Sequence, residues 1–254
     1  MKTFEKVYNL YDFSLKIKLE TPLHVGSSSE GISPLDVDNS VIRINDIPFI
    51  PGSSIKGVFR STLEFFLRSI NEKLACDVVG EKPCIDIRDE KFKKMNTEEK
   101  IRYIDEKACE VCKLFGSNFI ASKVEFEDAY ASKEIKTFNR DGVAIRRDSE
   151  SAANERKYDY EVINPGTIFE THMIGRNLED YEVGYILSII DLVNEGYAKF
   201  GGKKSAGLGK VRIDFEILKA DLSQIDGGFK KMHVDGSIYR KAFKNRLGGI
   251  ANVR

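Results

Sequence analysis

The sequence predicts a single α+β domain with a ferredoxin-like core and two insertions. Three observations support this fold class. Alternating apolar and polar residues indicate strands toward both ends of the chain. Two longer segments repeat apolar residues at helical spacing. The predicted elements follow the order β, β-hairpin, α, β, β, α, β, and no internal repeat or clear domain boundary divides the chain. We therefore expect one domain over residues 1–254.

The first predicted strand lies within residues 7–20, "VYNLYDFSLKIKLE", where Phe13, Leu15 and Ile17 alternate with polar residues. This alternation is typical of a strand with one buried face. A segment rich in Pro, Gly and Ser follows, "TPLHVGSSSEGISPLD", and predicts a loop. The stretches "NSVIRIND" and "IPFIPG" then predict a short hairpin.

The first predicted helix occupies residues 49–70, "FIPGSSIKGVFRSTLEFFLRSI", where apolar residues fall on one face. We expect Ser53 or Ser54 to be the N-cap, because a serine hydroxyl accepts a backbone N–H there. A second interpretation is that the free N–H groups of the helix start bind an anion. The polar stripe opposite the apolar face consists of Lys56, Arg60, Glu64 and Arg68.

The remaining elements include both insertions. Residues 71–113 are polar and rich in charge, which predicts an insertion with a helical piece near 96–107. The stretch "SKVEFEDAY" predicts a strand. Residues 133–160 lack apolar periodicity, which predicts a long exposed hairpin. The stretches "EVINPGTIFETHMIG", "EDYEVGYILSIIDLVNEGY" and "KVRIDFEIL" then predict a strand, a second amphipathic helix and a last strand.

The charge balance excludes a uniformly basic nucleic-acid binder, since the net charge is zero and the pI is about 6.9. Basic residues nevertheless cluster locally, at 199–212 and in the tail from 229 to 254. No apolar segment has the length of a signal-peptide core or a membrane span. We therefore expect a cytoplasmic protein without a membrane partner.

The chain contains four cysteines, spaced Cys-x7-Cys-x24-Cys-x2-Cys. In a reducing compartment, clustered cysteines favour a metal site over disulfides. The "CEVC" pair has the spacing with which two thiolates reach one tetrahedral ion. We expect structural Zn²⁺, although unrelated buried cysteines or a redox pair fit the spacing as well. Four thiolates leave no open position for catalysis at this metal, whose ligands would be Cys76, Cys84, Cys109 and Cys112.

A glycine-rich segment, "GGKKSAGLGKV", spans residues 201–211. It fails both the Walker A pattern and the dinucleotide fingerprint, because its glycines have other spacings and it leads into a strand. A flexible turn is one interpretation. The other is a groove where small residues let a polyanion approach the main chain, with Lys203 and Lys204 supplying positive charge.

Several motifs occur together here in one order: "TPLHVGSSSEG", "VDNSVIR", "FIPGSSIKGVFRSTLE", "CEVCKLFGS", "SKVEFEDA" and "GGKKSAGLGKV". In this combination the chain resembles the backbone subunit of type III CRISPR effector complexes of the Csm or Cmr type, within the RAMP superfamily of RNA-binding proteins. The resemblance covers residues 12–215, and each motif alone would be weak.

The resemblance implies an RRM-like core with a zinc-containing lid and a protruding thumb hairpin. It implies that copies of the chain stack helically along a guide CRISPR RNA beside other effector subunits. In many members a loop aspartate promotes endoribonuclease cleavage of the paired target RNA by attack of a 2′-hydroxyl, with Mg²⁺ or another divalent metal.

The resemblance also implies roles for particular residues. The stretch "VDNSV" matches a family segment of the form Ile-Asp-Ser-Pro-Val, which puts the catalytic aspartate at Asp38. Asn39 and Ser40 depart mildly from that pattern, and Asp36 is an additional carboxylate. The cysteine quartet matches the lid metal site. The implied RNA-binding residues are His24, Ser53, Ser54, Lys56, Arg60, Arg140, Arg146, Arg147, Lys203 and Lys204.

Other interpretations remain open from the sequence. His24 lies between apolar residues, as a structural histidine would, and the aspartates of the loop are also ordinary turn residues. The charges of 133–160 nearly cancel, as in a merely solvated hairpin. The chain would then be an architectural subunit without cleavage. A guide-processing endoribonuclease of the same superfamily also carries a late glycine loop, but the predicted zinc lid argues against it. An unrelated zinc enzyme would need an open metal position.

Overall fold

The computed structural model describes residues 6–26, 39–78, 80, 83–131, 133–145, 152–221 and 230–251. Structural statements below concern these residues. Within them, no helix combines the length and apolar character that crossing a membrane would require.

The centre of the fold is a six-stranded sheet in which all described pairings are antiparallel. The first strand is central, and its apolar residues Phe13, Leu15 and Ile17 are at most 1% exposed, which confirms the predicted alternation. Phe13 lies opposite Met173 on one neighbour and Ile217 on the other, so buried residues face one side of the sheet together. In spatial order the strands are β10 (Lys230–His233), β9 (Val211–Asp221), β1 (Leu10–Leu19), β8 (Ile168–Arg176) and β4 (Val124–Phe126), with β5 (Tyr130–Ala131) also paired to β8.

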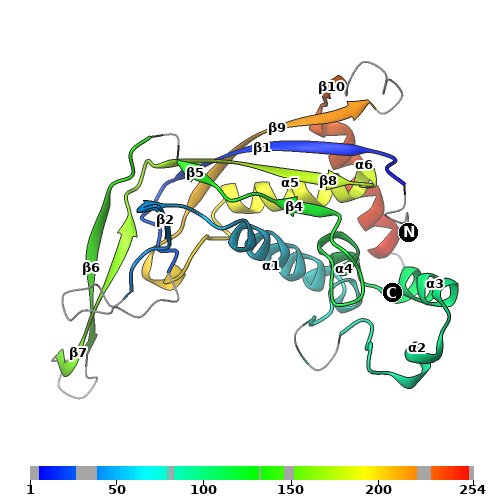
Figure 1. The fold of residues 1–254 in the computed structure, drawn as a ribbon, viewed down its shortest axis with the longest axis horizontal. Helices are drawn as coiled ribbons and strands as arrows, with labels where there is room; N and C mark the ends of the chain where they lie inside the picture. The colour runs from blue at the N-terminus through cyan, green and yellow to red at the C-terminus, as the bar shows by residue number, and fades with distance from the viewer. Residues whose placement is uncertain are drawn as a thin grey trace.

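Two long helices cover one face of this sheet, as Figure 1 shows. They are α1 (Gly52–Ile70) and α5 (Asp180–Asn194). With β1, β4, β8 and β9 they give the order β-α-β-β-α-β, and a short hairpin of β2 (Arg43–Ile44) and β3 (Ile47–Pro48) precedes α1. The predicted α+β class is confirmed, since helices and an antiparallel sheet form one mixed fold.

The C-terminal residues form β10 and a further helix, α6 (Gly236–Ala251), which the sequence analysis did not predict. The rings of Tyr185 on α5 and Phe243 on α6 meet edge to face at 5.4 Å. A Cβ at Gly184 would lie 2.4 Å from the carbonyl oxygen of Tyr239, so the close approach of α5 and α6 requires glycine there.

A long two-stranded hairpin, β6 (Thr137–Ile145) and β7 (Ala152–Ile163), projects away from the central sheet. This finding agrees with the predicted hairpin at 133–160, although β7 continues three residues further, to a buried end at Val162 and Ile163. Leu23 forms a β-bridge with Ile163 and fixes the hairpin root to the core. Arg146 and Arg147 lie outside the described residues.

The cysteine-bearing insertion projects from the other end of the domain to the same side as the hairpin, with α1 between them (Figure 1). The predicted helical piece is confirmed as α3, which begins with a capping box of Asn96 and Glu99. Among the described residues, Ile85 and Ala108 of this insertion form a small separate buried apolar cluster with Ile120. The helices are η1 (Glu72–Leu74), α2 (Glu90–Lys94), α3 (Thr97–Lys107) and α4 (Glu110–Phe115).

The start of α1 corrects one prediction. The N-cap is Pro51 rather than Ser53 or Ser54, and no side chain within the helix caps it. Instead the backbone N–H of Gly52 donates to Asp128 Oδ1 at 2.7 Å. A Cβ at Gly52 would lie 2.4 Å from the carbonyl oxygen of Phe126, the last residue of β4. The helix therefore begins at Gly52, one residue before Ser53, where a hydrogen bond to the distant Asp128 fixes its start.

A buried ion pair joins the segment before β4 to the first turn of α5. The ammonium of Lys123 lies 2.7 Å from both carboxylate oxygens of Glu182, and the two side chains are 5% and 2% exposed. Burial raises the pKa of Glu182. The same carboxylate accepts the backbone N–H of Glu179, as part of the capping box of α5.

Replacing Glu182 by alanine is expected to lower the free energy of unfolding by about 3–5 kcal/mol, because Lys123 would then be a buried charge without its partner. Urea denaturation followed by circular dichroism measures this change. Glu125→Ala, which breaks an exposed ion pair with Arg176, is the control and should cost less than about 1 kcal/mol. Equal losses for the two variants would contradict the prediction.

Candidate nucleic-acid interface and metal centre

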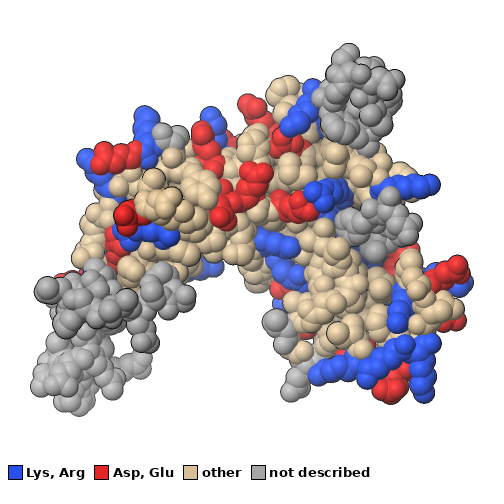
Figure 2. Space-filling model, viewed as in Figure 1, with Lys and Arg blue, Asp and Glu red and all other residues tan. Residues whose placement is uncertain are grey.

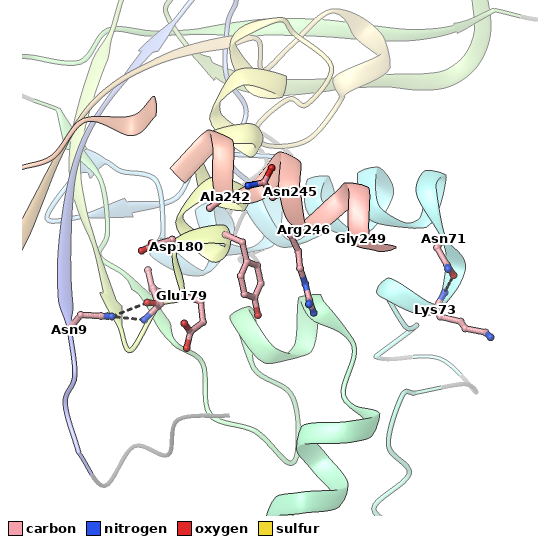
Figure 3. A pocket seen from close by; sticks show the side chains of 11 residues that line it. Asn9, Asn71, Lys73, Glu179, Asp180, Ala242, Asn245, Arg246 and Gly249 are labelled. Atoms are coloured by element: carbon pink, nitrogen blue, oxygen red, sulfur yellow. Dashed lines mark hydrogen bonds between the residues drawn. The ribbon is translucent and has the colours of Figure 1, made fainter. Parts of the chain in front are cut away.

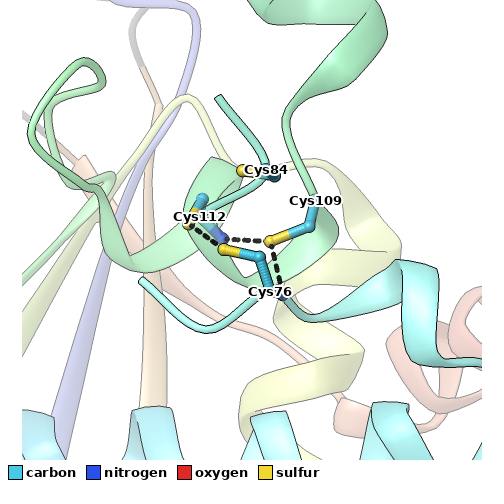
Figure 4. A group of neighbouring side chains, drawn as sticks. All are labelled: Cys76, Cys84, Cys109 and Cys112. Atoms are coloured by element: carbon cyan, nitrogen blue, oxygen red, sulfur yellow. Dashed lines mark hydrogen bonds between the residues drawn. The ribbon is translucent and has the colours of Figure 1, made fainter. Parts of the chain in front are cut away.

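The side chains of the four cysteines converge on one point, as Figure 4 shows. Their sulfur atoms all lie within 4.8 Å of one another, and Cys76 Sγ is 3.6 Å from Cys112 Sγ. In a tetrahedral ZnS4 site with Zn–S bonds of about 2.3 Å, sulfurs are about 3.8 Å apart. The group could therefore hold a metal ion, and the soft, closed donor set suits structural zinc. The predicted convergence of the cysteines is confirmed.

Hydrogen bonds within the group favour a thiolate at Cys109. The backbone N–H groups of Cys76 and Cys112 each donate to Cys109 Sγ at 3.4 Å. The thiols of Cys112, Cys76 and Cys84 hold the pKa of Cys109 far below its ordinary value, whereas Cys109 raises the pKa of Cys112. Cys109 is also the N-cap of α4, whose first turn carries Cys112. A negative sulfur at this helix start is therefore favoured.

The two predicted basic residues of α1, Lys56 and Arg60, differ in their contacts: only Arg60 contacts a cysteine among the described residues. Lys56 is half-buried, and burial together with the nearby Arg60 lowers its pKa. Arg60 instead points to the metal centre, with Nη2 3.4 Å from Cys112 Sγ. Ser53 is exposed and Ser54 half-buried, one and two residues into the helix. Figure 2 shows basic side chains over α1 beside acidic ones over the neighbouring strands.

The glycine loop lies against the segment that carries His24. Gly202 N–H donates to the carbonyl oxygen of His24 at 2.8 Å. A Cβ at Gly201 would lie 2.3 Å from the same oxygen, and the φ of Gly201 is +69°, so glycine is required by both space and backbone. The loop is thus a fixed backbone feature with exposed Lys204 beside it, rather than a free turn.

His24 and Lys203 meet on an aromatic ring that the sequence analysis did not single out. Lys203 Nζ lies 4.5 Å from the ring centroid of Tyr160, on β7, and His24 packs edge-on against the same ring at 5.9 Å. His24 Nδ1 is 2.7 Å from the carbonyl oxygen of Glu161, and the residue is 7% exposed. The structure therefore brings together the His24 segment, the glycine loop and the hairpin strand β7, three segments far apart in the sequence.

The predicted catalytic residue Asp38 and its neighbour Asp36 lie outside the described residues. The chain on either side is described and is well held. Gly26 and Val41 form a β-bridge, and the backbone N–H of Ile42 donates to the carbonyl oxygen of Val25 at 2.9 Å. Asn39, which follows Asp38 in the sequence, accepts the backbone N–H of Glu161 at 3.0 Å.

The carboxylate of Glu161 fixes the segment that follows Asn39. It is 7% exposed and accepts the backbone N–H of Val41 at 3.1 Å and Nη1 of Arg43 at 2.8 Å. Burial opposes its ionisation, but the hydrogen bonds led by Arg43 keep the pKa of Glu161 below its ordinary value. Further out on the hairpin, the Arg140 guanidinium lies 5.7 Å from the Phe138 ring centroid.

Two hollows contain features that the sequence analysis missed. A groove of about 610 Å³ between α1 and the end of α5 is lined by Phe65 and Tyr197, which are 72% and 80% exposed, and by Lys199 and Lys204. The sequence pattern does not distinguish these two aromatic residues from buried ones, and only their exposure in the structure shows that they lie on the surface. A larger cavity of about 950 Å³, shown in Figure 3, lies between the start of α5, α6 and η1, with Arg246 among its lining residues. It includes none of the predicted site residues.

Comparison with known proteins gives two results. A family model described as the RAMP superfamily matches residues 16–212. The chain is 30% identical over 241 residues to the "CRISPR system Cms endoribonuclease Csm3" of Streptococcus thermophilus, covering 86% of this chain and 90% of that protein. It is 40% identical over 68 residues to the protein of the same name from Methanothermobacter thermautotrophicus, covering 26% of this chain and 28% of that protein.

Proposed function

The chain belongs to the RAMP superfamily, and from this premise we propose that it is the guide-RNA-binding backbone subunit of a type III CRISPR effector complex. The observation that carries the proposal is the similarity to an endoribonuclease of a CRISPR system over 86% of the chain. Its partners would be the guide CRISPR RNA, the paired target RNA, further copies of itself and other effector subunits. The chain would form one domain with an RRM-like core, in which the insertion at 71–113 serves as a lid and the one at 133–160 as a thumb.

The guide RNA would run across three features on the side of the domain from which hairpin and lid project. At the start of α1, the Gly52 N–H is already bonded to Asp128, so the Ser53 and Ser54 hydroxyls and the Lys56 ammonium would contact a phosphate. In the glycine loop, the absence of side chains lets the RNA backbone approach, with Lys203 and Lys204 as counter-charges. His24 is buried, so we propose that it supports RNA binding by holding the glycine loop through its carbonyl oxygen. Arg140, Arg146 and Arg147 would contact RNA from the hairpin.

Cleavage of target RNA would take place beside Asn39, since Asp38 directly precedes it. The hairpin would distort the RNA so that a 2′-hydroxyl lines up with its own phosphate. Asp38 would orient the reacting groups from its loop, whose end Glu161 holds in place. Mg²⁺ or another divalent ion would neutralise charge on the reacting phosphate.

Zinc in the cysteine group would fasten the lid to the core. The lid's own buried cluster is small, so a metal cross-link supplies stability that packing does not. Four thiolates close the coordination sphere and give the metal a structural role.

Electron microscopy of the chain expressed with a guide RNA tests the proposed class. We expect a helical stack with one copy of the chain per regular interval of RNA. Protein that purifies free of RNA and forms no assembly when guide RNA and the remaining subunits are supplied would contradict the proposal.

The proposed RNA path makes a quantitative prediction for Lys56 and Lys203. Changing either to glutamate should weaken guide-RNA binding irrespective of sequence and lower the slope of log K against log salt by about 0.7 per lost phosphate contact. Filter binding at several salt concentrations measures the slope. Lys16→Glu, which alters an exposed lysine paired with Glu170 on the sheet, should leave the slope unchanged. An unchanged slope for both test variants would mean that neither lysine contacts a phosphate.

A further inference from the structure

The polar stripe of α1 faces the cysteine-bearing lid. Its residues Arg60, Glu64 and Arg68 are spaced one turn apart, and their side chains are 18%, 17% and 41% exposed. Surface residues of a solvated helix face would be largely exposed. The low exposure of Arg60 and Glu64 shows that the lid covers this part of the stripe.

Every nitrogen of the Arg60 guanidinium has a partner. Nε donates to Glu64 Oε1 at 2.9 Å, Nη1 to the carbonyl oxygen of Gly116 at 2.8 Å, and Nη2 to Cys112 Sγ at 3.4 Å. Gly116 is the C-cap of α4, so Arg60 holds both the sulfur in the first turn of α4 and the carbonyl group at its end. A phosphate would have to displace these contacts to bind Arg60.

Arg68 makes the matching contact with the other side of the cysteine group. Its Nε donates to the carbonyl oxygen of Ala75 at 3.0 Å and its Nη2 to that of Cys76 at 2.5 Å. Glu64 lies between the two arginines, with Oε2 3.7 Å from Arg68 Nη2. One helix stripe therefore holds the segments of Cys76 and of Cys112.

The net charge of the cysteine group with a bound metal ion gives a reason for two arginines beside it. A divalent ion with four thiolates carries a net charge of −2 in a place that is largely shielded from water. Arg60 and Arg68 supply two positive charges, and Glu64 keeps the guanidinium groups oriented. Hydrogen bonds to a metal-bound sulfur are the interactions through which surrounding residues tune metal affinity.

We propose that Arg60 and Arg68 are positioning residues of the metal centre, and that Arg60 sets its affinity for zinc through the bond to Cys112. This inference rests on the proposed zinc site. It also reassigns Arg60 from RNA binding, which the sequence resemblance implied, to support of the lid. Lys56, one turn earlier on α1, remains the proposed contact to a phosphate of the RNA.

Zinc affinity of the full-length chain, measured by competition with a chromogenic chelator, tests the proposal. Arg60→Gln is expected to weaken zinc binding 10–100-fold, the range found for residues that support metal ligands. Arg68→Gln should weaken it less, because Arg68 touches backbone carbonyl groups and no sulfur. Arg102→Gln removes the same charge from an exposed position on α3 and should leave affinity unchanged.

Two further measurements separate this role from a general loss of structure. Co²⁺ bound to Arg60→Gln should retain the sulfur-to-cobalt absorption of four thiolates at a higher metal concentration, with its energy shifted by the lost hydrogen bond. Arg60→Lys, which keeps the charge but not the fork of donors, should recover part of the affinity. Zinc-loaded Arg60→Gln should show the wild-type salt slope for guide RNA.

The outcomes distinguish this inference from the proposed centre itself. If the wild-type chain binds no zinc, the proposed centre is wrong and the inference falls with it. If the wild type binds zinc and Arg60→Gln binds it equally tightly, only the inference is overturned. Equal weakening by Arg60→Gln and Arg102→Gln would also overturn it, because the effect would then be one of total charge. A reduced salt slope in Arg60→Gln would return Arg60 to RNA binding.

Discussion

Replacing Asp38 by alanine is expected to abolish target-RNA cleavage by the assembled complex, while binding of guide and target RNA changes by no more than a few-fold. Affinity for RNA comes mainly from phosphate contacts, and a single loop carboxylate contributes little to them. Alignment of a 2′-hydroxyl with its phosphate, by contrast, depends on groups placed at the reacting atoms. Denaturing gels of labelled target RNA measure cleavage, and gel-shift titrations measure binding.

Two controls make this test specific. Asp36→Ala should retain most activity, because the family segment that Asp38 matches has no carboxylate at that place. EDTA should reproduce the effect of Asp38→Ala, since the proposed chemistry uses a divalent ion. If Asp38→Ala still cuts at regular intervals, the catalytic assignment is wrong. If the wild-type assembly binds target RNA and never cuts it, the chain is an architectural subunit.

The described residues next to the proposed catalytic loop are held by one strand of the hairpin. Asn39 is hydrogen-bonded to the backbone of Glu161, and the Glu161 carboxylate holds Val41 and Arg43. Glu161 belongs to β7, the strand that also carries Tyr160. The proposed thumb, the proposed catalytic loop and the glycine loop are thus joined at one strand. A shift of the hairpin on RNA would be transmitted to the residue beside Asp38.

Local sequence patterns predicted the elements of the core well. The alternation of Phe13, Leu15 and Ile17 predicted β1, and the apolar face of 49–70 predicted α1, because burial of one face imposes a period on the sequence itself. The pair Cys109 and Cys112 predicted one side of the metal centre for a similar reason, since a Cys-x2-Cys spacing lets two thiolates reach one ion from a single turn of the chain.

The partners of those elements could not be predicted in the same way. Asp128 binds the start of α1 from 76 residues away, and Glu161 binds Arg43 from 118 residues away. The i, i+4 pattern of Arg60 and Glu64 is the same whether a helix faces water or a lid. Lys203 was identified by its charge, but its aromatic partner Tyr160 was not. The periodicity of apolar residues and the positions of charged ones show which face of a helix or strand is polar. Only the folded structure shows what that face contacts.

The second large effect is expected from the metal ligands. Replacing Cys109 by serine should remove most of the one zinc ion per chain and loosen the lid while the central sheet stays folded. Cys109 is the sulfur that accepts both backbone N–H groups, from Cys76 and Cys112, so its loss removes a metal ligand and both of these hydrogen bonds. Elemental analysis measures the metal, and limited proteolysis followed by mass spectrometry locates the loosened segment. Lys107→Ser, an exposed change two residues before Cys109, is the control and should keep both zinc and protection.

The lid should loosen without the core because the two are stabilised differently. Structural zinc contributes about 10–16 kcal/mol in small zinc-bound folds. Between Cys76 and Cys109 the described lid residues bury little apolar surface, with Ile85 and Ala108 in a small separate cluster with Ile120, whereas β1 and α1 share a continuous apolar core with the rest of the domain. Cuts should therefore gather between Cys76 and Cys109 in Cys109→Ser and in the chelator-treated wild type. Cuts spread evenly over the chain would show instead that the metal holds the whole domain together, and an unchanged zinc content in Cys109→Ser would exclude Cys109 as a ligand.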